Sequence, residues 1–183
     1  MVTAPDKIVC VGVNYLDHVA EMGRDKPAAP TYFAKYRSAP IGARDDIALP
    51  SPDISTDIDW EVELGAVIGR AGKYISADDA EAHIFGYTVT MDISDRGGRP
   101  PGGNPLTSDW FVGKGHDTFA PMGPWIVPKE FYGNPMEILR QTLNVGDEVM
   151  QEATAGDMIH TLWEVVEYGS SIITLYPGDV IKN

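Results

Sequence analysis

The sequence predicts a protein with substantial β content, in which short strands are separated by turns and by a few short helices. The 183 residues include 19 glycines and 14 prolines, which is high for a helical bundle and typical of many turns between short strands. Several short apolar runs are rich in Val and Ile, and helical spacing is confined to a few segments. A chain of this length buries a sizeable core without crosslinks.

Charge and cysteine content exclude several classes of protein. The chain has 27 acidic residues against 14 Lys and Arg, for a formal net charge of −13. This excess argues against a surface for DNA, RNA or anionic membranes, because phosphate groups are bound by clustered cations. Cys10 is the single cysteine, so no internal disulfide is expected. Since we find neither an apolar run of about 18 residues nor a signal peptide, we expect a cytoplasmic protein.

Three elements are predicted near the N-terminus. Residues 7–13 form an apolar run that predicts a buried strand. Residues 15–22 predict a short helix, with Asn14 as its N-cap and Gly23 as the residue that ends it. After a loop, residues 31–35 predict a second short strand.

The central part begins with a concentration of carboxylates. Residues 44–63 contain seven acidic side chains and one cation. The apolar residues that follow predict a buried strand over 60–68. Residues 76–82 predict a helix with Ser76 as its N-cap, and the β-branched and aromatic run 84–93 predicts another strand.

The C-terminal half combines loops, one helix and further short strands. Residues 97–105 contain seven Gly or Pro, which predicts a mobile surface loop. Apolar residues at helical spacing predict a helix over 157–168 that ends near Gly169. The remaining segments predict strands: short ones at 110–114 and 124–127, a hairpin over 138–152, and two more over 171–181.

Glu61, Glu63 and Asp92 are candidates for a metal site. On a strand, Glu61 and Glu63 point to the same face, where two carboxylates repel each other unless a cation or a proton lies between them. A solvated strand face is the usual location of glutamate, but the apolar run that follows favours an enclosed site. Asp92 either pairs with Arg96, caps a turn, or completes a three-carboxylate site. Such a site suits Mg²⁺, Mn²⁺ or Ca²⁺.

Two further groups have both a chemical and a neutral interpretation. His18 and Glu21 share one face of the predicted helix, either as an exposed surface or as a carboxylate-oriented imidazole that takes a proton from water. Lys114 stands between two glycines, either as a surface lysine or as a cation that stabilises an enolate or carboxylate. The sequence contains no phosphate-binding loop, dinucleotide fingerprint, serine-hydrolase elbow or CxxC pair, which argues against those chemistries.

Five segments, taken in order, resemble the fumarylacetoacetate hydrolase family. VGVNYLDHVAEM at 11–22 resembles its G-x-N-Y-x-x-H-x-x-E element, and TYFAK at 31–35 resembles its strand that ends in lysine. DWEVELGAVIG at 59–69 resembles its metal strand, E-x-E-L-x-x-V-I-G. GYTVTMDISDR at 86–96 and WFVGKGHDTFAPMGPWIVP at 110–128 resemble its G-Y-T-x-x-N-D-x-S-x-R and K-x-x-D-x-x-x-P-x-G-P elements. The likeness spans nearly the whole chain.

The resemblance implies a fold and a cofactor. The implied fold is an α+β roll with a β-rich mixed sheet and few short helices. The family is commonly dimeric, so a homodimer is expected. The resemblance also implies that Glu61, Glu63 and Asp92 hold a divalent ion, either Mg²⁺ or Mn²⁺, with Ca²⁺ as a substitute.

The resemblance implies roles for further residues as well. Lys114 is expected to bind substrate oxygen atoms. The residues that match His18 and Glu21 form a pair that activates water in the hydrolases of the family. The implied substrate-binding residues are Tyr15, Lys35, Arg96 and Asp117.

The activity implied by the resemblance concerns small 2-oxo acids and β-diketones. The leading expectation is metal-dependent hydrolysis of a C–C bond in an acylpyruvate-like 2,4-dioxo acid, through a metal-bound enolate. Isomerisation or decarboxylation of a 2-oxo or hydroxymuconate-type diacid in the same site is the close alternative, since it needs no attacking water. An inactive fragment or paralogue that binds only a metal or a partner chain is the alternative of a different class.

The chain departs from the family pattern at three places. Met91 stands where the family has Asn, and Asp95 stands where it has Ala. The family continues past its P-G-D-x-I strand into a G-T-P-x-G-V-G loop and final strands, whereas this sequence ends at Asn183. We therefore expect residues 1–183 to form a single catalytic domain of this type that is incomplete at its C-terminus.

Overall fold

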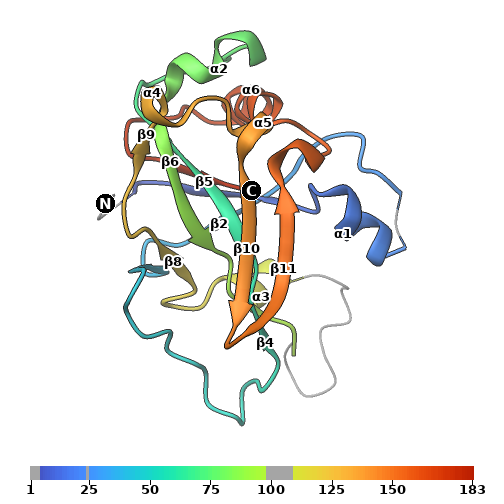
Figure 1. Cartoon of the computed structure of the whole chain (residues 1–183). Helices are drawn as coiled ribbons and strands as arrows, with labels where there is room; N and C mark the ends of the chain where they lie inside the picture. Colours follow the sequence, from blue (N-terminus) through green and yellow to red (C-terminus); the bar gives the residue numbers. More distant parts are fainter. Residues whose placement is uncertain (1–4, 24, 98–108) are drawn as a thin grey trace.

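A curled mixed sheet with few short helices forms the structure, a computed structural model that describes residues 5–23, 25–97 and 109–183 (Figure 1). The predicted loop 97–105 lies outside the described residues, apart from its first residue. The strands are β1 (Ile8–Gly12), β2 (Thr31–Lys35), β3 (Pro40–Gly42), β4 (Ile58–Asp59), β5 (Val62–Ile68), β6 (Ile84–Met91), β7 (Ser94–Asp95), β8 (Ala120–Met122), β9 (Val127–Pro128), β10 (Arg140–Val145), β11 (Glu148–Thr154) and β12 (Val180–Lys182). The helices are α1 (Leu16–Glu21), α2 (Ala77–His83), α3 (Trp110–Lys114), α4 (Lys129–Tyr132), α5 (Pro135–Ile138), the 3₁₀ turn η1 (Ala155–Asp157) and α6 (Leu162–Ile172).

The main sheet has the strand order β2-β1-β12-β5-β6-β8-β3, with β9 paired to β6. β12 runs parallel to β1 and antiparallel to β5, so the last strand lies within the sheet, between these two strands. The hairpin β10–β11 and the pair β4–β7 form two small separate sheets. The mixed sheet and the short helices confirm the expected α+β class and its β-rich mixed sheet.

The two faces of the main sheet carry different groups of side chains. Side chains alternate along a strand, so residues opposite each other in the ladder, such as Leu64 and Val89, share a face. We call the face that packs against α6 the outer face. It carries the larger core, in which Leu64 and Val9 meet Leu162 and Val165, and burying one such side chain is worth about 1.5–3 kcal/mol.

The opposite face is the inner face of the curled sheet. Its apolar part is a small cluster formed by Ile8, Cys10, Val67, Met122 and Val180. The candidate site occupies the rest of this face.

Helix α6 differs from its predicted bounds of 157–168. The Thr161 hydroxyl accepts a hydrogen bond from the Glu164 amide, and the Glu164 carboxylate accepts one from the Thr161 amide, so this capping box starts the helix at Leu162. Gly169 does not end the helix, because it lies within α6. The first of the two strands predicted over 171–181 does not form, because α6 continues to Ile172 and Leu175 makes an isolated β-bridge to Gly72. None of the helices in the described ranges is long and apolar enough to span a bilayer.

Three other local predictions were wrong. Residues 110–114 are helical rather than extended, because the Asp109 side chain accepts a hydrogen bond from the Val112 amide and caps α3. Asn14 is not the N-cap of α1, because its side chain instead donates to the carbonyl of His160 and to Asn183. Of the predicted strand at 124–127, only the last residue belongs to β9.

The other element predictions are confirmed with shifts of a few residues at their ends. Ser76 caps α2 by accepting a hydrogen bond from the Asp79 amide. Gly146, at a φ of 62°, forms the turn of the predicted hairpin, a conformation that favours glycine. Gly23 follows α1 with a φ of 61°, as expected for the residue that ends a helix.

Candidate metal centre and active site

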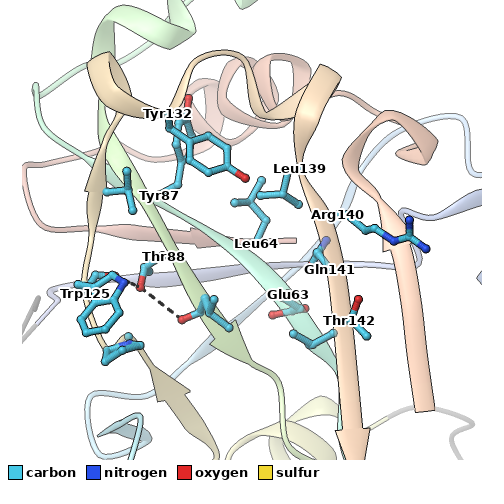
Figure 2. A pocket seen from close by; sticks show the side chains of 15 residues that line it. Glu63, Leu64, Tyr87, Thr88, Trp125, Tyr132, Leu139, Arg140, Gln141 and Thr142 are labelled. Atoms are coloured by element: carbon cyan, nitrogen blue, oxygen red, sulfur yellow. Dashed lines mark hydrogen bonds between the residues drawn. The ribbon is translucent and has the colours of Figure 1, made fainter. Parts of the chain in front are cut away.

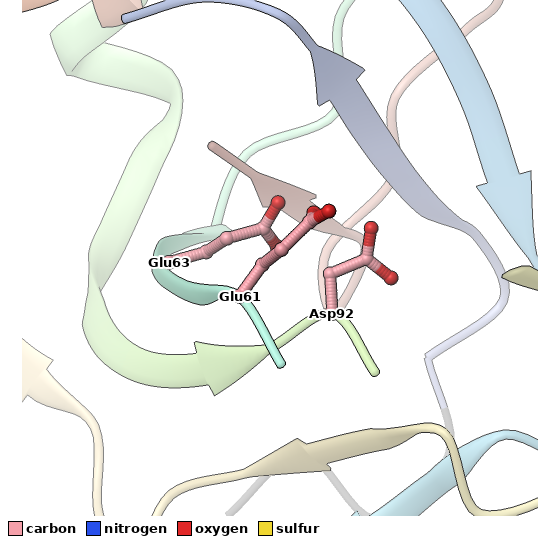
Figure 3. Close-up of side chains that lie close together, drawn as sticks. All are labelled: Glu61, Glu63 and Asp92. Atoms are coloured by element: carbon pink, nitrogen blue, oxygen red, sulfur yellow. The ribbon is translucent and has the colours of Figure 1, made fainter. Parts of the chain in front are cut away.

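Glu61, Glu63 and Asp92 converge on the inner face (Figure 3). Each offers a carboxylate oxygen, and these three oxygens lie within 4.8 Å of one another. Glu63 lies in β5 and Glu61 two residues before it, so alternation directs both side chains to one face. Asp92 follows β6, the neighbour of β5, and its amide donates to the Glu61 carbonyl at 2.8 Å. Strand pairing therefore positions all three carboxylates, which we call the triad.

The triad fits a hard divalent cation. The Asp92 side chain is fully buried, the Glu63 side chain is 9% exposed and the Glu61 side chain is 25% exposed. Within the described residues, Glu63 Oε2 and Asp92 Oδ1 are buried oxygens that accept no hydrogen bond. Both atoms instead lie at ion-pair distance from an ammonium group, Lys182 Nζ at 3.2 Å and Lys35 Nζ at 2.6 Å. Carboxylate oxygens are also the ligands that Mg²⁺ and Ca²⁺ prefer, so these atoms suit a cation.

Lys114 lies against the triad and contacts Glu61, its most exposed member. Its ammonium donates to Asp92 Oδ2 at 2.7 Å, to Glu61 Oε2 at 2.9 Å and to Ser94 Oγ at 2.6 Å. An ammonium has three N–H donors, so all three are engaged in these contacts. The structure thus brings Lys114 to the carboxylates, on helix α3 rather than on the strand that the sequence predicted.

Each carboxylate of the triad also has its own cation. Arg96 donates to Glu61 Oε1 at 2.5 Å, and Lys35 Nζ lies 2.6 Å from Asp92 Oδ1. Lys182 Nζ lies 3.2 Å from Glu63 Oε2. Lys182 was not found from the sequence, because sharing a face with Val180, two residues earlier in the strand, does not by itself show that this face lies beside the carboxylates.

Burial and neighbouring charges shift the pKa values of the site in opposite directions. Burial raises the pKa of Glu63 to about 7, although Lys182 opposes this shift. Burial alone would raise the pKa of Asp92, but Lys182, Lys35 and Lys114 outweigh it and lower that pKa to about 2. Burial alone would likewise lower the pKa of Lys182, but Glu63 and its neighbours outweigh it, so the pKa of Lys182 is raised. Asp92 and Lys182 are therefore charged at neutral pH.

His18 and Glu21 are not brought to the triad. They lie on α1 with side chains 51% and 77% exposed, and His18 Nδ1 is 3.8 Å from Glu21 Oε2. In the part of the chain that the structure describes, no hydrogen bond or ion pair joins them to Glu61, Glu63 or Asp92. Their role in activating water stays a prediction.

The four predicted substrate-binding residues divide into two pairs. Lys35 and Arg96 contact the triad directly. Tyr15 is instead half-buried, and its hydroxyl accepts a hydrogen bond from Gln141 Nε2. Asp117 is exposed in the turn after α3. The roles predicted for Tyr15 and Asp117 stay predictions.

A second polar cluster lies beside the triad and involves Asp95, one of the departures from the family pattern. Its buried carboxylate accepts hydrogen bonds from Ser55 Oγ at 2.5 Å and from the Gly97 amide at 2.9 Å, and lies 3.0 Å from His116 Nε2. The cluster joins β7 to the loop that precedes β4 and to the segment that follows α3. It therefore fixes the backbone next to Arg96.

A cavity of about 270 Å³ opens between β5, β6, β9 and β10 (Figure 2). Leu64, Tyr87, Trp125 and Gln141 are among its lining residues, and Glu63 is the member of the triad that they include. Leu64 and Tyr87 also belong to the larger core, which places the cavity on the outer face. Its lining includes neither Lys114 nor Asp92, so the cavity borders the charged cluster at Glu63 and does not enclose it.

Comparison with protein families and known proteins adds independent information. Residues 7–182 match the family described as Fumarylacetoacetate (FAA) hydrolase C-terminal. The mitochondrial oxaloacetate tautomerase FAHD2A of Bos taurus is 45% identical over 180 residues, which cover 98% of this chain and 55% of the relative. The chain thus spans about half the length of the curated relatives it matches.

Two solved structures show the same likeness in three dimensions. A 5-carboxymethyl-2-hydroxymuconate delta-isomerase from Mycobacterium smegmatis is 36% identical, with a TM-score of 0.83 over 98% of this chain and 67% of its own. A maleylpyruvate hydrolase from Sphingobium sp. SYK-6, solved with manganese(II) and pyruvate, is 30% identical, with a TM-score of 0.80 over 98% of this chain and 59% of its own. These relatives are enzymes that carry the names of tautomerase, isomerase and hydrolase. The chain belongs to the fumarylacetoacetate hydrolase family.

Proposed function

We propose that this protein is a divalent-metal-dependent enzyme that stabilises the enolate of a small 2-oxo acid. The observation that carries the proposal is the convergence of three carboxylate oxygens within 4.8 Å, with Lys114 in contact with two of the carboxylates. In this proposal Glu61, Glu63 and Asp92 hold Mg²⁺ or Mn²⁺, with Ca²⁺ as a substitute. When bound, the ion supplies Lewis-acid polarisation of the substrate carbonyl. The manganese in the maleylpyruvate hydrolase structure supports the proposed divalent metal, and the pyruvate in it supports a small 2-oxo acid as the substrate.

The residues around the triad have two proposed tasks. Arg96 and Lys35 hold the carboxylates of Glu61 and Asp92 in place, so that the site needs little reorganisation when a substrate arrives. Lys114 donates to the substrate, because its N–H groups lie among the same oxygens that would face the substrate and the ion. An N–H of Lys114 that now points at a carboxylate then hydrogen-bonds to a substrate oxygen on which negative charge develops.

Proton transfer, in the form of tautomerisation or isomerisation, is the first candidate reaction. It requires groups that stabilise an enolate, which are assembled on the inner face, and a carrier that takes the proton from carbon and returns one to oxygen, for which solvent water serves in this proposal. It does not require His18 and Glu21, which lie exposed on α1. The similarity to an oxaloacetate tautomerase and to a hydroxymuconate isomerase supports this candidate. The order thus differs from the sequence argument, which favoured hydrolysis.

Hydrolysis of a C–C bond in an acylpyruvate is the second candidate. The observation in its favour is the separation of 3.8 Å between His18 Nδ1 and Glu21 Oε2. A carboxylate beside Nδ1 leaves the second ring nitrogen, Nε2, to take a proton from water. The similarity to a maleylpyruvate hydrolase supports it as well.

One set of assays tests the proposal and separates the candidates. Metal-stripped protein is supplied with MnCl₂ and given oxaloacetate, whose enol is followed by absorbance, or an acylpyruvate, whose cleavage is followed by pyruvate release. Glu61→Gln should remove both activities. Asp59→Asn is the matched control, because Asp59 also pairs with Arg96 but lies outside the triad. Activity of Glu61→Gln equal to wild type, or full activity in EDTA, would contradict the proposal.

His18→Ala decides between the two candidate reactions. Under the first candidate, tautomerisation continues at an appreciable rate. Under the second, pyruvate release falls by about 10²- to 10⁴-fold, the usual contribution of a general base. Tautomerisation that fell to the same extent as hydrolysis would place His18 in the proton-transfer step instead.

We also propose that residues 1–183 act as one catalytic domain and that the protein is a homodimer. The family match over residues 7–182 supports the first proposal. Size-exclusion chromatography with light scattering tests the second, since a mass of one chain would contradict it.

A further inference from the structure

Lys182 is a fully buried lysine that the proposed reaction does not use. In the sheet it lies between Cys10 of β1 and Gly65 of β5, and its side chain is 0% exposed. Alternation with Ile181 directs it to the inner face, where the triad lies. A charge without a partner would be very costly at such a position, so its partners are informative.

The contacts of Lys182 lead to the triad. Its ammonium donates a hydrogen bond to the Met91 carbonyl at 2.8 Å, which anchors it to the end of β6. The same nitrogen lies 3.2 Å from Glu63 Oε2 and 3.9 Å from Asp92 Oδ1. These are the two buried oxygens of the triad that accept no hydrogen bond from the described residues. Lys182 therefore contributes charge to the two atoms best suited to an ion.

Lys182 differs from Arg96 and Lys114 in its freedom to move, and it shares this property with Lys35, which is also 0% exposed and donates to the carbonyls of Ile93 and Phe119. The Arg96 side chain is 40% exposed and that of Lys114 is 10% exposed, so both border on solvent. Lys182 is enclosed within the sheet and held by a backbone carbonyl. A divalent ion that joins the triad therefore meets a fixed positive charge beside Glu63.

We infer that Lys182 sets the affinity of the triad for divalent cations by opposing them, and that it serves as the counter-charge of Glu63 when no such cation is bound. This inference rests on the proposed function, because it assumes that the triad is the metal site. A neighbouring opposite charge alters the proton affinity of a carboxylate by about 10- to 1000-fold, and the repulsion of a divalent ion is of the same order. Removing the charge of Lys182 should tighten Mn²⁺ binding by at least about tenfold, or about 1.4 kcal/mol.

Titration calorimetry of MnCl₂ into metal-stripped protein tests the inference. Lys182→Met removes both the charge and the hydrogen bond to Met91, whereas Lys182→Gln removes the charge and keeps a donor. Lys7→Met is the matched control, because Lys7 also pairs with a fully buried carboxylate, Asp179 at 2.8 Å, and its loss changes the net charge equally. Both Lys182 variants should bind Mn²⁺ more tightly than wild type, and Lys7→Met should match wild type.

The outcomes separate this inference from the proposed function. If wild type binds Mn²⁺ and the Lys182 variants bind it equally or more weakly, the inference is wrong and the proposed function stands. If neither wild type nor any variant binds Mn²⁺, both are wrong. If the Lys182 variants are unfolded in EDTA, the inference requires that MnCl₂ restore the wild-type circular dichroism spectrum. Failure to fold at millimolar MnCl₂, while wild type stays folded, would overturn it.

Discussion

The inner face of the sheet and helix α1 both carry residues with predicted catalytic roles, but the structure holds them in different ways. On the inner face, Asp92 is fully buried and lies 2.6 Å from Lys35 and 2.7 Å from Lys114. On α1, the His18 and Glu21 side chains are 51% and 77% exposed and lie 3.8 Å apart. The sequence predicted both the carboxylate triad and the His18–Glu21 pair, but the fold positions the triad more firmly than the pair.

The cause of the difference is the number of partners that each element has. β5 and β6 pair along their whole length, so the register fixes where the side chains at their ends point. α1 has six residues, no side-chain N-cap and one buried side chain, Val19. A helix this short is not stable by itself, so its position depends on the few contacts it makes. The comparison indicates that strand pairing holds the carboxylates of the proposed metal site in place, whereas few contacts hold the proposed water-activating pair.

The largest expected effect comes from removing the most buried charge. Asp92→Asn leaves the ammonium groups of Lys35 and Lys114 without their full counter-charge, and breaking a buried ion pair in this way costs about 3–5 kcal/mol. The free energy of unfolding, measured by urea denaturation in EDTA, should fall by that amount. Asp17→Asn is the control, because Asp17 is exposed on α1 and its loss should cost less than about 0.5 kcal/mol. Equal losses in the two variants would remove the distinction between the regions.

The next effect concerns the anchor of α1. Val19→Ala removes two buried carbon atoms and should cost about 1.5–2.5 kcal/mol. Val19 is the buried side chain of α1, so its truncation should loosen this helix and not the sheet. Hydrogen exchange should therefore accelerate at the Met22 amide, which donates to the His18 carbonyl, and stay unchanged at the Leu64 amide of β5. Leu16→Ala, an exposed change on the same helix, is the control. Faster exchange at Leu64 would show that α1 and the sheet unfold together.

A smaller effect is expected in acid. Burial alone would raise the pKa of Asp95, but hydrogen bonds from Ser55, the Gly97 amide and His116 outweigh it and hold that pKa below its usual value. The unfolded chain therefore binds the proton more readily, so Asp95 stabilises the fold above about pH 4 and this contribution is lost as the pH falls further. The urea concentration at the midpoint of unfolding should decrease as the pH is lowered from 6 to 2, and it should decrease less steeply for Asp95→Asn than for wild type. Parallel curves would mean that Asp95 does not contribute.

The smallest effect is expected from His18→Ala, measured as stability rather than activity. His18 is exposed and has no buried contact to lose, so the unfolding free energy should stay within about 0.5 kcal/mol of wild type. In a thermal melt this corresponds to a shift of less than about 2 °C. A shift of more than about 4 °C would show that His18 packs against the body of the protein and would weaken the comparison.

Much of the fold was predictable because local patterns and the final structure agree. The apolar runs of β5 and β6, the cap at Ser76 and the hairpin at Gly146 all follow from spacing and turn chemistry. Residues 110–114 were not predictable in the same way, because an apolar segment this short fits a strand or a helix equally well. Asp109 and the packing of Trp110 against Phe33, with ring centroids 4.9 Å apart, favour the helix.

The candidate site also contains residues that could be predicted from the sequence and one that could not. Glu61, Glu63 and Asp92 could be grouped from alternation and from the adjacency of two strands, and the structure brings them together. Lys182 could not be grouped with them, because a lysine side chain usually lies in solvent. Its burial depends on the insertion of β12 between β1 and β5, a pairing between residues far apart in sequence that no local pattern encodes.

The most direct test of the central claim is a crystal structure of the protein grown with MnCl₂, with an anomalous difference map recorded at the manganese edge. The account predicts one strong peak bonded to an oxygen from each of Glu61, Glu63 and Asp92, with Lys114 displaced from at least one of its present carboxylate partners. A map without a peak at these residues, in which Lys114 still bridges Glu61 and Asp92, would contradict it.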